Sequence, residues 1–372
     1  MEHFITEIAI DKLLHLSNIT IHLNPDHKQH LILTGKNGSG KTSLLTELKD
    51  FLWDICQALS PGEGLQQHQV KISVNHSEDL RMQCLQGNFI MAYFPADRKT
   101  QIDRSSGVED IRLHNFYEID FTPGSLLQKY MVHLKTQQAY AKNEEDIVTV
   151  ERIQKWFDRF VNSLRVLLDD DSITLEYDYK EYNFKIHVAG REPFGFDTLS
   201  DGYSSVIYIL SDLILRMDKN WLQGGGLSKY DIEGIVLIDE IETHLHIGLQ
   251  KKILPFLTNF FPEIQFIVTT HSPYILNSIS NARVYDLERY IELENPLLYS
   301  SDTLAEGYFG ADEYADQLKE KINRYGRLKE KADLTEDERA ERARLRSELK
   351  NIPKGLSPEA ADKYYEIEGV RL

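Results

Sequence analysis

The stretch that decides the fold is GKNGSGKT at Gly35–Thr42, which follows the apolar run Leu31–Thr34. A glycine, four residues and then Gly-Lys-Thr is the P-loop pattern. Its glycines let backbone N–H groups close around phosphate oxygens, since a Cβ would block them. The helix expected to follow adds N–H donors and the positive end of its dipole. We expect Lys41 to act as a catalytic residue that neutralises the charge of the β- and γ-phosphates. We expect Thr42 to ligate Mg²⁺ through its hydroxyl. The predicted nucleotide contacts are Gly35, Asn37, Gly38, Ser39, Gly40, Lys41, Thr42 and Ser43.

A second apolar run, Ile235–Ile238, ends in two carboxylates. Short apolar runs suit parallel strands whose two faces are both covered, and α/β sheets bind ligands at the carboxyl ends of such strands. Asp239 is therefore expected to hold Mg²⁺, directly or through water. Its neighbour Glu240 could orient and deprotonate an attacking water molecule. On its own, the pair of carboxylates Asp239 and Glu240 is weak evidence of a site, but the P-loop in the same chain makes this pair informative.

Two further features lie near strand or helix ends. The run Phe266–Thr269 leads to His271, which could hydrogen-bond a γ-phosphate or the attacking water; the alternative is a histidine with a purely structural role. Ser200 and Gly202 precede the apolar helix expected over 203–217. A helix N-terminus binds anions, although an ordinary serine N-cap explains the same residues.

The remaining pattern predicts an alternation of short strands and helices. We expect strands at 4–10, 19–23, 30–34, 70–74 and 89–94, a helix over 41–60, helices within 125–168, and a hairpin from 173–179 and 183–189. From about residue 311 the chain is densely charged, and we interpret it as a small helical appendage; a partner-binding face is the alternative. Within it, Thr335–Glu338 has the spacing of a capping box, and a short helix is expected to start at Ser357.

Composition narrows the class of protein. The 372 residues carry a formal net charge of −17, which argues against broad binding to nucleic acid or to anionic membranes. Two cysteines, Cys56 and Cys84, cannot build a disulfide framework, so a cytoplasmic location is the simplest expectation. The longest apolar run, 206–215, is interrupted by Ser211 and Asp212 and is too short to span a bilayer. The N-terminus has no signal-peptide pattern.

In their order along the chain, the four motifs resemble the ABC-type ATPase head, in the branch that includes SMC and RecF-like proteins. Gly35–Thr42 corresponds to Walker A, Leu199–Tyr203 to the signature, Ile235–Glu240 to Walker B and His271 to the switch histidine. The resemblance implies an α/β P-loop head with a mixed central sheet over residues 1–290 and a helical insertion at about 121–170. A strand-loop and the helical appendage would occupy 291–372. The resemblance also implies ATP and Mg²⁺ as ligands and the hydrolysis of ATP to ADP and phosphate as the reaction.

More narrowly, Ile238–His246 and Phe266–Pro273 look like the small bacterial AAA-type ATPases of anti-phage systems of the Septu and retron type. In ABC heads the signature binds the nucleotide held by the opposite subunit. The resemblance therefore implies a homodimer with composite ATP sites, which controls a separate effector such as an HNH or TOPRIM nuclease. The alternative is a DNA repair or recombination ATPase that binds DNA directly, and DNA stays open as a partner. No membrane partner is expected.

Two departures from the family pattern stand out. Asp201 occupies a signature position where the family usually has glycine. No glutamine of a Q-loop can be placed with certainty, and the equivalent stretch is Tyr93–Arg98. We list Arg98 as a candidate phosphate contact, with a surface salt bridge as the alternative. His244 and His246 alternate in the segment that resembles the D-loop, and we interpret them as interface contacts rather than metal ligands.

Overall fold

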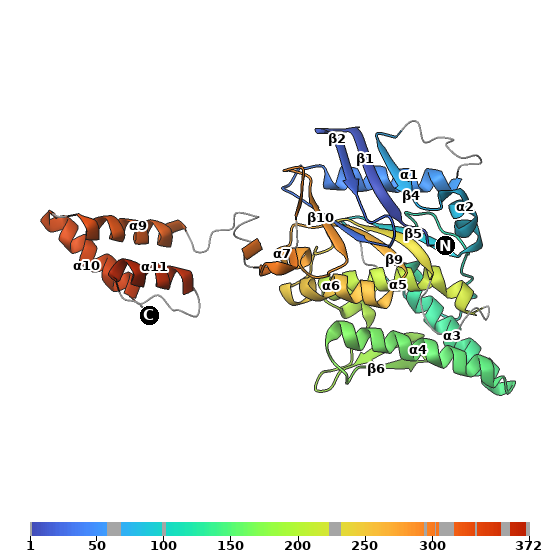
Figure 1. Cartoon of the computed structure of the whole chain (residues 1–372). Coiled ribbons are helices and arrows are strands. Elements are labelled where there is room, and N and C mark those ends of the chain that lie inside the picture. The colour runs from blue at the N-terminus through green and yellow to red at the C-terminus, as the bar shows by residue number, and fades with distance from the viewer. Residues whose placement is uncertain are drawn as a thin grey trace. The chain divides into compact units, whose positions relative to one another are not determined.

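Figure 1 shows the chain as a computed structural model. It describes residues 2–57, 68–98, 102–222, 232–293, 296–301, 303–304, 316–331, 333–350 and 358–369. The chain divides into two compact units, Met1–Leu298 and Tyr299–Leu372. None of the helices in these ranges is both long and apolar enough to cross a membrane.

A six-stranded sheet forms the centre of the first unit, with the strand order β11-β10-β3-β9-β8-β5. All neighbouring pairs are parallel except β10 with β11, so the sheet is mixed. Its strands are β3 (His30–Thr34), β5 (Phe89–Phe94), β8 (Glu233–Ile238), β9 (Ile264–Thr269), β10 (Ala282–Asp286) and β11 (Ile291–Leu293). Every residue of β3 and β9 is buried, as expected for strands covered on both faces.

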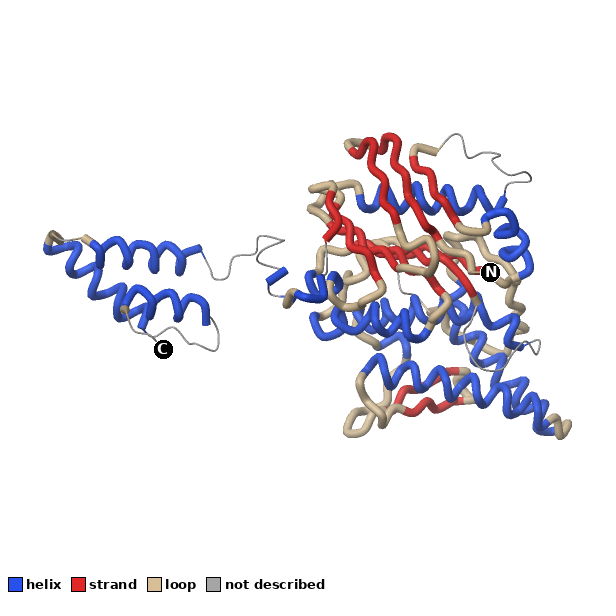
Figure 2. Tube along the Cα trace, viewed as in Figure 1, coloured by secondary structure: helices blue, strands red, loops and turns tan. Residues whose placement is uncertain are grey.

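Helix α1 (Lys41–Gln57) packs on one face of this sheet (Figures 1 and 2). Its buried leucines share a hydrophobic core with alternate residues of the strands, such as Leu31, Leu33 and Leu237. Above that core lies a three-stranded antiparallel sheet of order β2-β1-β4, with α2 beside it. These elements are β1 (Ile5–Leu13), β2 (Leu16–His22), β4 (Val70–Val74) and α2 (Ser77–Gln86).

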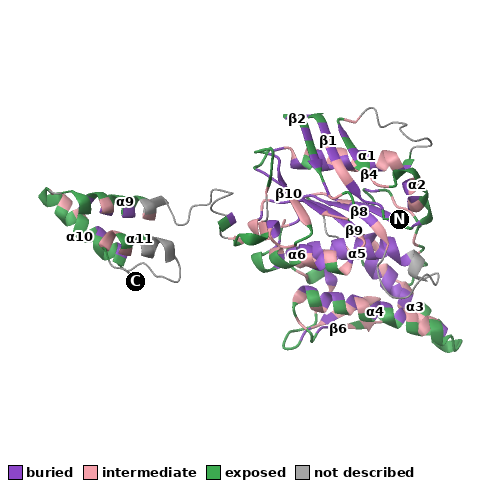
Figure 3. Cartoon of the chain, viewed as in Figure 1, coloured by how far each residue is buried: buried purple, intermediate pink, exposed green. Residues whose placement is uncertain are grey.

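Helices α5 (Asp201–Leu222) and α6 (Ile247–Phe260) cover the opposite face of the sheet, and Figure 3 shows how buried α5 is. A further layer packs on them, because α3 contacts α5 and α4 contacts α6. This layer contains α3 (Leu127–Asn143), α4 (Ile147–Leu168), β6 (Thr174–Asp178) and β7 (Asn183–His187). The short helices are η2 (Pro123–Leu126), η3 (Phe196–Thr198), α7 (Pro273–Leu276) and η4 (Pro296–Leu298).

Most elements expected from the sequence are confirmed. The strands at 30–34, 70–74 and 89–94 have the predicted bounds, and the helix expected over 41–60 extends to Gln57, beyond which 58–60 lie outside the described residues. The hairpin is confirmed as β6 and β7, and α5 is longer than the predicted 203–217. Helix α2 was not predicted, because its sequence has only two buried residues and no clear apolar stripe.

The second unit is a small helical cluster of α9 (Asp316–Glu330), α10 (Glu336–Lys350) and α11 (Pro358–Glu368). Its core contains Ile322, Tyr325, Leu328, Leu345, Leu349 and Tyr364. The predicted capping box at the start of α10 is confirmed: Thr335 N donates to Glu338, and Glu338 N donates to the Thr335 hydroxyl. Ser357, the expected start of the last helix, lies outside the described residues.

Candidate functional site

The P-loop connects β3 to α1. Gly35, Gly38 and Gly40 have φ angles of 134°, 83° and 91°, which only glycine adopts without strain. A Cβ on Gly35 would also lie 2.8 Å from Ser39 Oγ and 3.2 Å from Asp286 Oδ1. The loop is thus held in a tight turn that directs the chain into the N-terminus of α1, the arrangement that suits phosphate binding.

Lys41 begins α1 and its side chain turns back into the loop. Its Nζ donates hydrogen bonds of 2.9 Å to Gly35 O and 3.0 Å to Lys36 O. The residue is 6% exposed, and burial lowers the pKa of its ammonium, although nearby carboxylates led by Glu240 and Asp239 oppose this shift. The structure therefore keeps the cation inside the loop and close to the acidic groups that follow β8.

Three oxygen-bearing side chains meet at the carboxyl edge of the sheet. The Thr42 hydroxyl donates to Asp239 Oδ2 at 2.7 Å, and the Thr269 hydroxyl donates to Asp239 Oδ1 at 2.5 Å. Asp239 is 1% exposed and immediately follows β8. Strands β3, β9 and β8 are parallel neighbours, so their ends lie side by side. Hydroxyl and carboxylate oxygens are the ligands that Mg²⁺ prefers, and Thr42 and Asp239 thus fit the predicted metal site.

The turn after Asp239 carries the other acidic groups. Glu240 has a φ of 44°, an unusual value for a residue with a side chain, and its backbone N–H donates to Thr269 Oγ1 at 2.7 Å. Glu242 accepts a hydrogen bond from the backbone N–H of His271. Its other oxygen is buried without a hydrogen-bond partner. The carboxylate of Glu242 therefore fixes the loop that bears the predicted switch histidine.

His271 lies in this cluster, as the sequence predicts. Burial, followed by the neighbouring Lys41 cation, lowers the pKa of its imidazole, while Glu242, Glu240 and Asp239 oppose the shift. The ring is therefore neutral at pH 7 and carries both a hydrogen-bond donor and an acceptor. Such a group can contact a γ-phosphate oxygen or a water molecule without adding charge.

The predicted signature residues lie at the N-terminus of α5. Ser200 and Asp201 are exposed, whereas Gly202 is buried against the turn that follows Glu240. A Cβ on Gly202 would lie 2.7 Å from His244 O, so the glycine permits a close approach of the two backbones. No hydrogen bond links residues 199–203 to residues 35–42, all of which the structure describes. The structure therefore does not bring this segment into the P-loop of the same chain.

Arg98 lies in the segment that follows β5 and is 7% exposed. Its guanidinium donates to backbone carbonyls at residues 95, 239, 240 and 241 and to the Ser205 hydroxyl. These contacts use all five of its N–H groups. Arg98 therefore forms no surface salt bridge in the described residues and holds the backbone of the Walker B turn, while its contact with phosphate stays a prediction.

Sequence reasoning missed three members of the cluster. Glu242 and Thr269 lie in or next to the predicted motifs, but the sequence alone does not mark either as a site residue. Asp286 ends β10, is 1% exposed and faces Gly35. The signal for Asp286 was its position after an apolar run, the same signal that identified Asp239. That run was not recognised, because it contains Arg283 and lies outside the four motifs.

The arrangement has the groups that phosphoanhydride hydrolysis requires. Glycine turns and a helix N-terminus can bind phosphates, Lys41 can neutralise them, and Glu240 is placed to orient water. Mg²⁺, held by Thr42 and Asp239, would supply charge neutralisation at the β- and γ-phosphates. Lys41, which lies in the P-loop after β3, and the carboxylates of Asp239 and Glu240, which follow β8, thus lie at the same edge of the sheet.

A comparison with known families decides the classification. The family described as "AAA domain, putative AbiEii toxin, Type IV TA system" matches residues 85–277, more than half of the chain. The chain belongs to this AAA domain family. The matched part contains the signature, Walker B and His271, and the P-loop precedes it. The match therefore agrees with the α/β P-loop fold and with the site geometry described above.

Curated relatives cover parts of the chain. The Septu protein PtuA of Bacillus mycoides is 29% identical over 267 residues, which are 68% of this chain and 33% of that protein. The Retron Ec83 probable ATPase of Escherichia coli is 37% identical over 98 residues, 26% of this chain and 18% of the relative. The chain thus spans about a third or less of the length of these relatives.

Solved structures were compared as well. The SMC head bound to the C-winged helix domain of ScpA has a TM-score of 0.42 and 11% identity, and the match covers 79% of this chain and 96% of the SMC head. The SMC head domain from Thermotoga maritima has a TM-score of 0.39 and 12% identity, with coverage of 76% and 94%. The α/β P-loop fold follows from the strand order of the central sheet and from the P-loop between β3 and α1.

Proposed function

We propose that this protein is an ATPase and acts as a homodimeric switch, which binds ATP at composite sites and controls a separate effector in anti-phage defence. The observation that carries the proposal is the cluster in which Thr42, Asp239, Glu240 and His271 meet beside the P-loop, while the signature at Ser200 lies outside it. A second chain can then supply the signature to each nucleotide. ATP would favour the closed dimer and hydrolysis would release it, a population shift that a partner can detect.

The relatives support the biological setting. The Septu protein PtuA and a retron probable ATPase share sequence with this chain, and the proposal of an effector nuclease, of the HNH or TOPRIM kind, comes from that resemblance. The cytoplasm is the proposed location. A net charge of −17 favours a protein partner over direct DNA binding as the primary contact.

Light scattering of the purified chain tests the dimer. We expect Glu240→Gln, which slows hydrolysis, to double in mass with Mg-ATP and to stay monomeric without nucleotide. Ser200→Arg in the same background should abolish the change. Ser77→Arg is a matched control, because Ser77 is also an exposed serine at a helix N-terminus but lies on α2, away from the site. A mass that does not depend on nucleotide would refute the switch.

ATPase assays with duplex DNA separate the proposal from a DNA repair ATPase. The switch predicts turnover that DNA leaves unchanged at physiological salt. A DNA-binding ATPase predicts stimulation that falls steeply as salt rises, because binding releases counterions from the DNA. Stimulation of that kind would replace the effector proposal with the alternative.

A further inference from the structure

The guanidinium of Arg98 joins two parts of the site that are far apart in the sequence. On one side it donates to the carbonyls of Asp239, Glu240 and Ile241, at 2.9, 3.2 and 3.2 Å. On the other side its Nε donates to Ser205 Oγ at 2.8 Å. Ser205 lies on the first turns of α5, the helix that begins at the signature. One side chain thus contacts both the turn that bears the predicted general base and the signature helix.

The surroundings of Arg98 favour a fixed position. It is 7% exposed and Ser205 is 1% exposed, so solvent offers neither group a substitute partner. Burial lowers the pKa of the guanidinium to about 10, with Glu242, Asp239 and Glu240 opposing the shift, and the group stays charged at pH 7. Hydrogen bonds from a charged donor are stronger than neutral ones, and a buried donor that loses its acceptor is costly.

The same helix approaches the turn at a second point. Gly202 leaves no room for a Cβ beside His244 O, so the backbones of α5 and of the turn are in close contact at that point. Further along α5, Arg216 donates to Met91 O of β5 at 2.9 Å and pairs with Asp212 at 2.6 Å. Helix α5 therefore contacts β5 and the turn after β8, and the hydrogen bond from Arg98 to Ser205 joins α5 to this turn just after the signature.

We propose that Arg98 is a positioning residue that sets the backbone of the Walker B turn and, through Ser205, couples this turn to the signature helix. This inference rests on the proposed function, since it assigns a role within ATP hydrolysis. A misplacement of about 1 Å at a catalytic group can cost on the order of 100-fold in rate. The link should therefore affect turnover more than nucleotide affinity, because Arg98 makes no hydrogen bond to the P-loop residues 35–42, all of which the structure describes.

The test compares two serines of one helix. Ser205→Ala removes the acceptor of the Arg98 Nε–H group. Ser211→Ala removes an equally buried hydroxyl that bonds only within α5, to Ile207 O. We expect Ser205→Ala to lower kcat about tenfold, the effect of one lost charged hydrogen bond, with the Kd for a fluorescent ATP analogue unchanged. Ser211→Ala should change neither quantity. Arg98→Lys, which cannot reach all five acceptors, should lower kcat about 100-fold.

A double-mutant cycle isolates the link. Arg98→Lys combined with Ser205→Ala should cost no more than Arg98→Lys alone, while Arg98→Lys combined with Ser211→Ala should show additive effects. Equal kcat values for Ser205→Ala and the wild type would overturn the inference, as would additivity in the first cycle. A wild-type chain that neither hydrolyses ATP nor dimerises would instead refute the proposed function, so the two failures are distinguishable.

Discussion

The Thr42 hydroxyl donates a hydrogen bond of 2.7 Å to Asp239 Oδ2, although 197 residues separate the two in the chain. Their proximity follows from the sheet, because β3 and β8 flank β9 and all three end at the same edge. Thr269, at the end of β9, bonds the other oxygen of the carboxylate. One buried carboxylate is therefore oriented by two hydroxyls, one from the start of α1 and one from the end of β9.

The first prediction concerns this pair. Thr42→Ser keeps the hydroxyl and should retain turnover, whereas Thr42→Val keeps the shape without it. We expect Thr42→Val to raise the Mg²⁺ concentration needed for half-maximal ATPase activity by about tenfold, since a proposed ligand and the orienting bond are both lost. A Mg²⁺ titration at saturating ATP measures this shift. An unchanged midpoint for Thr42→Val would show that the hydroxyl does not ligate the ion.

The second prediction separates Glu242 from Glu240. Glu242→Gln retains an oxygen that can accept the His271 N–H, while Glu242→Ala leaves that N–H without its acceptor. We expect Glu242→Ala to lower kcat about tenfold and Glu242→Gln to lower it much less, because the role of Glu242 is to hold the loop. Glu240→Gln should reduce turnover by at least about 100-fold, as for a lost general base. If both Glu242 variants lost activity equally, its charge rather than its hydrogen bond would matter.

These residues show what the sequence could reveal. The P-loop, Asp239, Glu240 and His271 were all predictable, because each follows an apolar run and parallel strands bring such ends together. The structure confirms that they meet. The positions of the expected strands therefore suffice to predict that these residues meet, without knowledge of any side-chain contact.

The buried polar links were not predictable in the same way. Ser211 and Asp212 looked like interruptions in an apolar run, yet both are fully buried in α5. Asp212 pairs with Arg216 and accepts the backbone N–H of Gly124, a partner 88 residues away. The environment of Arg98 likewise comes from β8 and α5. Periodicity shows which face is apolar, but the partners of a buried charge depend on the tertiary fold.

The third prediction concerns a buried carboxyl in the same helix. Burial raises the pKa of Asp218 to about 7, although hydrogen bonds led by the one from Trp156 oppose the shift. Because this value exceeds that of an unfolded aspartate, ionised Asp218 destabilises the fold progressively as pH rises from about 4 through about 7. Asp218→Asn removes the charge and can still accept the indole N–H bond.

We therefore expect Asp218→Asn to be more stable than the wild type at pH 8, by on the order of 4 kcal/mol, and to show little difference near pH 4. Urea unfolding at both pH values measures this difference. The low-pH comparison is an internal control for packing changes caused by the amide. If the gain in stability of Asp218→Asn over the wild type were larger at pH 4 than at pH 8, the raised pKa of Asp218 would be contradicted.

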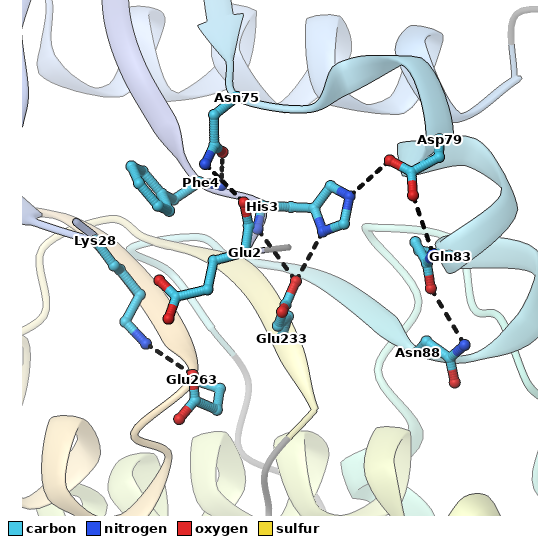
Figure 4. Close-up of polar contacts among 10 residues, drawn as sticks. All are labelled: Glu2, His3, Phe4, Lys28, Asn75, Asp79, Gln83, Asn88, Glu233 and Glu263. Carbon is cyan, nitrogen blue, oxygen red and sulfur yellow. Dashed lines mark hydrogen bonds and ion pairs between the residues drawn. The ribbon is translucent and has the colours of Figure 1, made fainter. Parts of the chain in front are cut away.

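The last prediction concerns His3, which joins β8 to α2 (Figure 4). Its Nδ1 lies 2.8 Å from Glu233 and its Nε2 lies 2.8 Å from Asp79. Burial lowers the pKa of the imidazole, but the hydrogen bonds and charges of the two carboxylates outweigh it and raise the pKa above 6.5. The stabilisation by His3 is therefore complete below pH 6.5 and is lost as pH rises through the raised folded value.

His3→Gln cannot carry the positive charge that bridges both carboxylates. We expect it to lower the urea midpoint clearly at pH 5.5 and much less at pH 9, where the wild-type imidazole is neutral too. His22→Gln is the control, because His22 also lies beside a carboxylate, Glu7, at 3.0 Å, but is 66% exposed. Exposed pairs contribute little, so its midpoint should match the wild type at both pH values. Equal losses for His3→Gln at pH 5.5 and pH 9 would mean that the residue stabilises by packing rather than by charge.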